Sequence, residues 1–332
     1  MNSKSMLNEN SAATHPELAR AEGLWFADGG LIIQAETTLF RVYREFLAVH
    51  SGVFRDMLFI PIPADAETMD GCPLVRLQDS AEDTAYFLKA LLYPDFFKSF
   101  PGPTTFDILS GVLRMSHKYD VDALQKRALI HLSARFPTTL DGWDETKAVD
   151  TTFGATLSSL LAVVILARQV DALWILPSAF YRLCEERYAD NHIINGEGGF
   201  ELTATDKLTC VSGVRKLETT FTSKVLKFLY HPRGFPGCRS SAVCAESRAK
   251  AAWTAEVSRN YSPQLSTRDL LPLNNWTCDD WEDFLDLCCK TCIAAMKVQH
   301  QKARESVWNE LPFVFQLPDW VELERMKAEA LR

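Results

Sequence analysis

The stretch "FRVYREFLAVHSGVFRDML", residues 40–58, changes its apolar spacing part-way along. It begins with the two-residue alternation of a strand and ends with the three- and four-residue spacing of a helix. Ser51 and Gly52 interrupt the helical part, and because serine is a favoured N-cap residue, we expect two short helices rather than one. His50 is expected on the exposed side. The apolar positions expected in the core are Phe40, Val42, Leu47 and Phe54.

Length and composition indicate a two-domain protein outside the membrane. The chain has 332 residues, of which 47% are hydrophobic, so it can bury a sizeable core. A net charge of -8 disfavours a general affinity for the phosphates of nucleic acids. The polar N-terminal segment does not resemble a secretory signal, and the longest apolar run is interrupted by Arg168, short of the roughly 20 residues of a membrane helix. We expect an intracellular protein, cytoplasmic or nuclear.

Strand signals are confined to the first third of the chain. Residues 31–34 and 39–43 predict a hairpin, and "PLVRLQD", residues 73–79, predicts a third strand. Helical patterns follow, the first of them beginning at Ser80, and strand signals nearly vanish after residue 136. This order predicts an α+β domain followed by a mostly α-helical domain. The expected parts are a flexible tail over 1–20 with a helical turn at "PELARA", a first domain over 21–136, a linker over 137–155 and a second domain over 156–332.

Four short motifs occur in a familiar order: "FADGGLIIQ" at 26–34, "FRVYREFLAVHSGVF" at 40–54, "FLKALLYPDFF" at 87–97 and "VLRMSHKYDVDAL" at 112–124. Together they resemble a BTB/POZ domain, whose fold is a small mixed sheet capped by helices. Tyr43 stands where many members of this family have a histidine. This substitution resembles the fungal, basidiomycete-type BTB proteins, which have a helical C-terminal domain. The residues that carry the resemblance are Asp28, Phe40, Val42, Tyr43, Leu47, Ser51, Phe54, Leu91, Leu92 and Tyr119.

The resemblance implies a protein–protein interaction function. Its two versions are self-association, as a homodimer, and an adaptor role in which the first domain recruits a cullin-type ubiquitin ligase and the second selects the substrate. For the adaptor version, Leu77 and Asp79 are the candidate partner contacts. A purely structural interpretation, in which Asp79 and Ser80 only cap the following helix, stays open.

Catalytic motifs do not occur in the sequence. It contains no Gly-x-Ser-x-Gly, no glycine-rich phosphate loop followed by Lys-Ser/Thr and no His-Glu-x-x-His. The glycines of "NGEGG", residues 195–199, have the wrong spacing for dinucleotide binding and are typical of a surface loop. We therefore expect a protein that is not an enzyme and that has no organic cofactor.

Cysteines gather in the second half, where eight of the nine lie after residue 180. Cys238 stands in a Pro/Gly loop and Cys244 follows a serine that can cap a helix, while Cys289 and Cys292 form a Cys-x-x-Cys pair. Four such thiolates can close a tetrahedral structural zinc site that joins the two segments. Two alternatives stay open, namely that these are buried thiols without a metal, and that His231 replaces one of them as a ligand.

The charge of the second half is uneven. Residues 201–260 hold more Lys and Arg than Asp and Glu, and residues 263–286 are acidic. Such segments can pair within the domain or attract separate partners. An alternative function is therefore a transcriptional or chromatin regulator with a zinc-stabilised C-terminal half.

Overall fold

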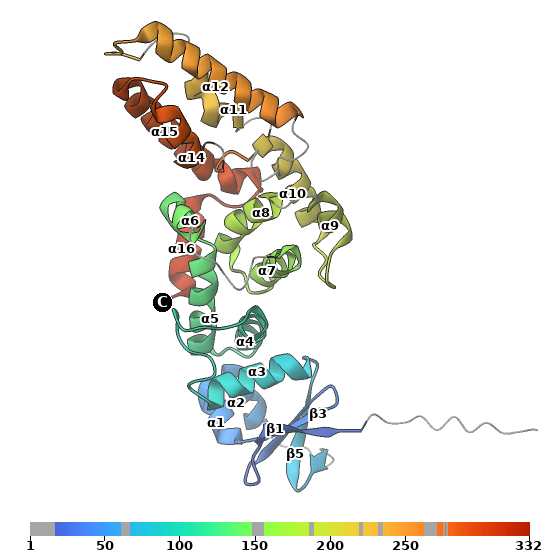
Figure 1. Ribbon diagram of the computed structural model, residues 1–332. Coiled ribbons are helices and arrows are strands. Elements are labelled where there is room, and N and C mark those ends of the chain that lie inside the picture. Colours follow the sequence, from blue (N-terminus) through green and yellow to red (C-terminus); the bar gives the residue numbers. More distant parts are fainter. Residues whose placement is uncertain are drawn as a thin grey trace, which may run out of the picture. The chain divides into compact units, whose positions relative to one another are not determined.

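The computed structural model describes most of the chain, and it divides into two compact units. The first unit comprises 1–98 and 110–125, and the second comprises 99–109 and 126–332. Figure 1 shows strands in the first unit and helices throughout the second. The described residues are 17–60, 67–147, 156–185, 189–218, 222–231, 235–261, 271–274, 276 and 278–332.

A five-stranded mixed sheet forms one layer of the first unit. The strands lie in the order β1-β3-β2-β5-β4, with β2 antiparallel to β3 and parallel to β5. The predicted hairpin and third strand are thereby confirmed. The strands are β1 (Ala19–Trp25), β2 (Leu31–Ala35), β3 (Thr38–Val42), β4 (Thr68–Met69) and β5 (Cys72–Leu77).

The hairpin of β2 and β3 supplies the centre of this sheet. Leu31, Ile32 and Ile33 are fully buried, and since successive side chains of a strand point to opposite faces of the sheet, β2 is covered on both faces. One face carries a small cluster around Ile32, Leu39 and Cys72. The β2 sequence is accordingly apolar except at Gln34 rather than alternating.

After β3, the chain enters the two short helices that the sequence predicts, α1 (Arg44–His50) and α2 (Gly52–Phe59). The Ser51 hydroxyl accepts the backbone N–H of Phe54 at 3.0 Å, which is an N-cap bond, and it donates to the carbonyl of Tyr119. Ser51 is buried, so one side chain both starts α2 and ties it to a distant segment. His50 is exposed, as expected.

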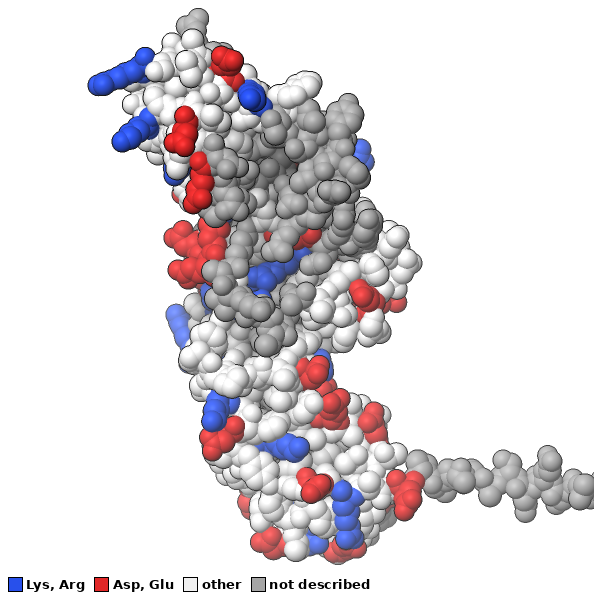
Figure 2. Space-filling view, viewed as in Figure 1, with Lys and Arg blue, Asp and Glu red and all other residues white. Residues whose placement is uncertain are grey.

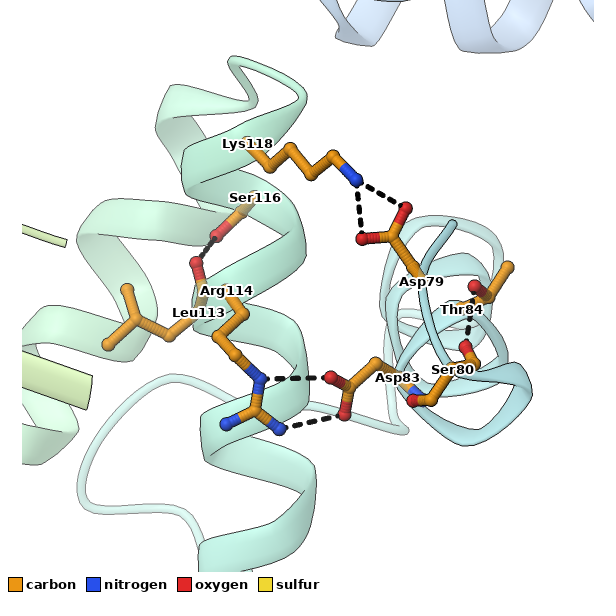
Figure 3. Close-up of polar contacts among 8 residues, drawn as sticks. All are labelled: Asp79, Ser80, Asp83, Thr84, Leu113, Arg114, Ser116 and Lys118. Atoms are coloured by element: carbon orange, nitrogen blue, oxygen red, sulfur yellow. Dashed lines mark hydrogen bonds and ion pairs between the residues drawn. The ribbon is translucent and has the colours of Figure 1, made fainter. Parts of the chain in front are cut away.

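Helices α3 (Ala81–Leu92) and α4 (Phe106–Lys118) are joined by two ion pairs, which Figure 3 shows in close-up. The Arg114 guanidinium donates both Nε and Nη2 to the Asp83 carboxylate at 2.9 Å. Lys118 Nζ contacts both oxygens of Asp79 at 2.7 and 2.8 Å. Since paired, part-buried charges hold fixed geometry, these contacts orient α4 on α3.

The predicted tail over residues 1–20, with a helical turn at "PELARA", is wrong from residue 19 onward. Ala19 and Arg20 belong to β1, which pairs in parallel with β3, and there is no helical turn over 19–21. Only Leu24 of this strand is fully buried. An edge strand of this kind is held by backbone hydrogen bonds to its neighbour, so its side chains carry little pattern.

The regular secondary structure in the described part of the second unit is helical, apart from one isolated bridge between Glu197 and Phe200. The predicted helical stripe from Leu157 is confirmed as α7, and Thr156 caps it through a reciprocal bond with Ser159. The elements from α5 onward are α5 (Asp122–Arg135), α6 (Leu140–Lys147), α7 (Leu157–Gln169), η1 (Leu173–Ile175), α8 (Leu176–Glu185), α9 (Ala189–Asn195), α10 (Ala204–Lys216), α11 (Thr222–Val225), η3 (Leu226–Tyr230), α12 (Ser241–Tyr261), α14 (Cys278–Leu285), α15 (Lys290–Val314) and α16 (Trp320–Ala330).

The expected linker over 137–155 contains a packed helix, α6. Its Trp143 is buried, with the ring centroid 5.2 Å from that of Tyr181 and 5.9 Å from that of Trp308. A single large aromatic in an otherwise polar segment gives no periodic signal, yet it buries enough apolar surface to fix the helix. Residues 148–155 of the expected linker lie outside the described part of the chain.

Candidate metal centre

Four cysteine side chains from two separate segments of the helical unit meet at one place. Cys238 lies in the loop before α12, and Cys244 lies in the first turn of that helix. Cys289 is the N-cap residue of α15, and Cys292 lies in the first turn of α15. The starts of α12 and α15 therefore meet at the cluster. Each contributes two cysteines, one before its first residue and one within its first turn.

The local sequence explains these positions. Gly237 adopts φ 79°, in the left-handed region that glycine tolerates, and the backbone N–H of Cys238 then donates to the carbonyl of Phe235 at 2.9 Å. The N–H of Cys244 donates to the Ser240 carbonyl at 2.9 Å as α12 begins. The glycine turn thus places Cys238 beside the helix start, so the loop ligand and first-turn ligand are arranged as predicted.

The sulfur atoms have the separations of a metal-ligand set. All four Sγ atoms lie within 4.8 Å of one another, and those of Cys238 and Cys289 are 3.7 Å apart. Four sulfurs at about 2.3 Å from a tetrahedral zinc ion would be about 3.8 Å apart. A disulfide needs about 2.05 Å, and all four thiols are free. The cluster is therefore compatible in size with an S4 tetrahedron.

The acidity of these thiols differs strongly. The pKa of Cys289 is lowered to about 6, chiefly because the backbone N–H of Cys292 at the start of α15 faces its sulfur. Burial is the main reason that the pKa values of Cys288 and Cys292 are raised to about 12. Helix-start N–H groups favour a thiolate at Cys289, whereas the buried thiols need a cation to ionise near neutral pH.

Two of the four cysteines lie in an apolar core, while Cys238 and Cys289 are partly exposed. Cys244 and Cys292 are fully buried and pack with Phe228, Phe284 and Met296. The residues of this core come largely from η3, α12, α14 and α15, the last three of which are labelled in Figure 1. Because four protein ligands in an apolar surround leave no open position, the arrangement is suited to holding segments together rather than to metal-based catalysis.

Two further side chains border the four sulfurs. Arg248 is 0% exposed; its Nη2 donates to the carbonyl of His231 at 3.1 Å, and its positive charge opposes the rise in the pKa of Cys288. Cys288 was not among the predicted ligands, and its Sγ contacts the carbonyl oxygen of Cys244 at 3.7 Å. The doublet Cys288-Cys289 marks both residues, but adjacent cysteines point in different directions and their spacing does not tell which one faces the cluster.

The alternative ligand His231 is not part of the cluster found among the described residues. Its ring stacks on Phe235, with centroids 4.7 Å apart. The structure thus brings together the four cysteines proposed from the sequence and places the imidazole against an aromatic ring instead.

Most residues on which the BTB/POZ resemblance rests are core residues. Tyr43 is different, because its hydroxyl donates to Asp28 at 3.0 Å, which raises the pKa of Tyr43. Leu91 and Leu92 are half-buried. The buried members are Phe40, Val42, Leu47, Ser51, Phe54 and Tyr119.

The candidate partner contacts Leu77 and Asp79 lie at the exit of β5. Leu77 is half-buried, and the Asp79 side chain is only 15% exposed. The Asp79 carboxylate accepts the hydroxyl of Tyr119 at 2.6 Å as well as the ammonium of Lys118. Ser80, not Asp79, caps α3 through the N–H of Asp83 at 3.1 Å. Both oxygens of the Asp79 carboxylate therefore have hydrogen-bond partners within its own unit.

Comparison of the chain with protein-family models, curated proteins and solved structures gives no match. The BTB/POZ assignment accordingly stays a prediction, while the mixed sheet followed by helices is what the structure contains. In the described ranges, no helix combines the length and the apolar composition that crossing a bilayer requires.

Proposed function

We propose that the chain is a protein-interaction protein without catalytic activity, which self-associates through α1 and α2 of the α+β unit. One observation carries the proposal: these two consecutive short helices expose large apolar side chains. Val49 is 80% exposed and Phe59 is 79% exposed, and both Val53 and Ile60 are also exposed. Apolar side chains grouped on neighbouring elements are typical of a protein-binding surface.

Charge on the same helices favours a second copy as the partner. Arg55 and Asp56 are both exposed and lie next to each other on α2. In a two-fold symmetric dimer the same surface meets itself, so a surface with both signs of charge can pair with its own copy. The order of the hairpin, α1, α2 and β5 also supports the BTB/POZ resemblance, which implies self-association.

The adaptor version receives less support. It relied on Asp79 as a partner contact, and that carboxylate is bound by Lys118 and Tyr119. Releasing it would leave charged and polar groups without their partners, at a cost that partner binding would have to offset. Recruitment of a cullin stays a prediction that affinity purification with mass spectrometry tests.

Self-association is tested by sedimentation velocity on the full chain and on matched variants. We expect a dimer for the wild type, and a monomer with unchanged melting temperature for the double variant Val49→Glu/Phe59→Ser. The control is Val321→Glu/Phe313→Ser, which changes the same residue types at positions that are both 80% exposed in the helical unit. A monomeric wild type, or equal dissociation of both double variants, would refute the proposal.

We further infer that the four cysteines bind one zinc ion with a structural role. The S4 separations and the closed, apolar surround support this inference. Protein purified without chelators is expected to contain one zinc per chain, and cobalt substitution should give the thiolate-to-metal absorption of a tetrahedral S4 site. Cys244→Ser should lose the metal, whereas Cys210→Ser, a change at an equally buried cysteine outside the cluster, should retain it.

The alternative of a nucleic-acid-binding regulator is less well supported. Several basic residues of the 201–260 region have partners within the unit: Lys207 pairs with Glu201, and Lys224 lies 3.4 Å from Glu310. Arg248 is buried. Side chains used in this way are not available to phosphates, and a mobility shift on DNA that weakens with salt would be the result that revives the alternative.

A further inference from the structure

A separate pocket lies in the helical unit, where the segment leading into α6 meets α15 and the start of α16. Its volume is about 400 Å³. The side chains that characterise it are two tryptophans, two carboxylates and two amides. They are Trp308, Trp320, Asp141, Glu305, Gln301 and Asn309.

The two indole rings are held in fixed positions. The rings of Trp308 and Trp320 stack with centroids 5.4 Å apart and an angle of 6° between their planes. Trp308 Nε1 donates to the carbonyl of Thr138 at 3.3 Å, and Trp320 Nε1 donates to the carbonyl of Trp308 at 2.8 Å. Trp308 is only 4% exposed whereas Trp320 is half-buried, and both ring N–H groups are bound within the protein, so what the pocket offers a ligand is the aromatic surface of Trp320.

The charged lining is acidic. Asp141 and Glu305 are exposed, and Gln301 Nε2 donates to Glu305 Oε1 at 3.1 Å, which orients that carboxylate. The described lining includes no Lys or Arg, although the ammonium of Lys327 donates to Oγ1 of the lining residue Thr138 at 2.9 Å. Nearby Arg304 instead binds Asp144 through both Nη atoms, at 2.9 and 2.6 Å. Figure 2 shows acidic side chains gathered on the surface over α6.

We propose that this pocket binds the side chain of an arginine presented by a protein partner. A cation is attracted both to the face of an indole ring and to carboxylates, and the pocket places the two kinds of group together. The planar guanidinium can stack on an indole and donate to two acceptors at once, which the compact ammonium of lysine does less well. The chain's net charge of -8 also favours a basic partner.

The pocket shares no residue with the α1–α2 surface or with the four cysteines. Loss of self-association or of zinc can therefore be recognised separately from loss of arginine binding. The pocket extends the proposed interaction function to a second surface of different chemistry.

The test is fluorine NMR of the full chain labelled with 5-fluorotryptophan, with the Trp320 resonance assigned from the Trp320→Phe variant. The probes are the acetylated amides of arginine, lysine and norleucine. We expect the Trp320 signal to shift and saturate with the arginine probe in the millimolar range, to respond more weakly to lysine and not to respond to norleucine. A response to norleucine equal to that for arginine, or no response to arginine, would overturn the proposal.

Charge variants make the test specific to the pocket. Asp141→Asn/Glu305→Gln should weaken arginine binding by roughly tenfold or more, since both carboxylates that attract the cation lose their charge. The control Glu22→Gln/Asp95→Asn removes the same charge from exposed positions outside both the pocket and the α1–α2 surface, and it should bind as the wild type does. Equal affinity of the pocket variant and the wild type would show that the carboxylates do not recognise the probe, and the proposal would fall.

Discussion

In the α+β unit, distant segments are joined by backbone ladders and ion pairs, whereas in the core around the four cysteines they meet at sulfur atoms. Strand β5 aligns with β2 over four residue pairs, and Asp83 binds Arg114 across 31 positions of sequence. Around the cysteines, Cys238 and Cys289 approach to 3.7 Å across 51 positions. The first arrangement is complete without a further component. The second brings four thiols together, so under the proposed zinc site its stability would depend on the metal.

Metal removal should produce the largest difference in stability between the cysteine core and the α+β unit. Structural zinc in small domains contributes about 10–16 kcal/mol of apparent binding free energy, far more than a single packing contact. Treatment with a strong zinc chelator is therefore expected to abolish amide protection in α12 and in the first turns of α15, while β2 and β3 keep theirs. Hydrogen exchange with mass spectrometry measures both regions in one sample. Simultaneous loss of protection in β2 and β3 would mean that the two regions are not independent.

Phe87→Ala should produce the opposite pattern. Phe87 of α3 is buried and packs near Tyr119, with ring centroids 6.0 Å apart. Truncating a buried phenylalanine costs about 3–5 kcal/mol, through lost transfer energy and a cavity. We expect lower protection in the α+β unit and an unchanged zinc content. Loss of zinc from this variant would contradict the expectation that the α+β unit and the cysteine core are stabilised independently. The control for the loss of an aromatic side chain is Phe313→Ser, at an exposed position.

Arg248→Met tests whether the buried guanidinium beside the cysteine core contributes to zinc affinity. Four thiolates around a zinc ion carry a net charge of -2, and the buried guanidinium of Arg248 partly offsets a negative charge in that core. Changes next to a metal site typically reduce affinity by about 10–100-fold, or about 1.4–2.7 kcal/mol. Competition with a chromogenic chelator would measure the loss. Arg304→Met, which removes another nearly buried arginine from its pair with Asp144, should leave zinc affinity unchanged.

The same comparison shows what could be predicted from the sequence. Features set by short-range chemistry were predictable: the break at Ser51, the β2–β3 hairpin, and the meeting of four cysteines from two segments. In each case a few neighbouring residues carry the signal, because caps, turns and ligands demand particular side chains.

Features that depend on distant neighbours could not be predicted. Strand β1 has one fully buried side chain and exists because β3 offers it backbone partners. Helix α6 is polar apart from Leu140 and Trp143, and it is fixed by the packing of that indole against Tyr181 and Trp308. Similarly, nothing in the sequence around Asp79 indicates that Lys118 and Tyr119 occupy its carboxylate.

The smallest expected effect compares one helix cap from each unit. The Ser51 hydroxyl is buried and serves both the N–H of Phe54 and the carbonyl of Tyr119, whereas Thr156 is an exposed cap of α7. Ser51→Ala should cost about 1.5 kcal/mol, because the cap is lost and a buried carbonyl loses a donor, and Thr156→Ala should cost about 0.5 kcal/mol. Urea denaturation, read out by hydrogen exchange for each unit, measures both.

Equal costs for the two caps would show that the Ser51–Tyr119 bond contributes little. In that case apolar packing, such as the stacking of the Phe54 ring on that of Tyr119 with centroids 4.8 Å apart, would hold α2 to the segment that contains Tyr119. A larger cost at Ser51 would instead show that the residue separating α1 from α2 also anchors them to the rest of the unit. Since the proposed dimer surface is built on those two helices, Ser51→Ala should then weaken self-association without changing any exposed apolar side chain, and sedimentation velocity on this variant would detect the change.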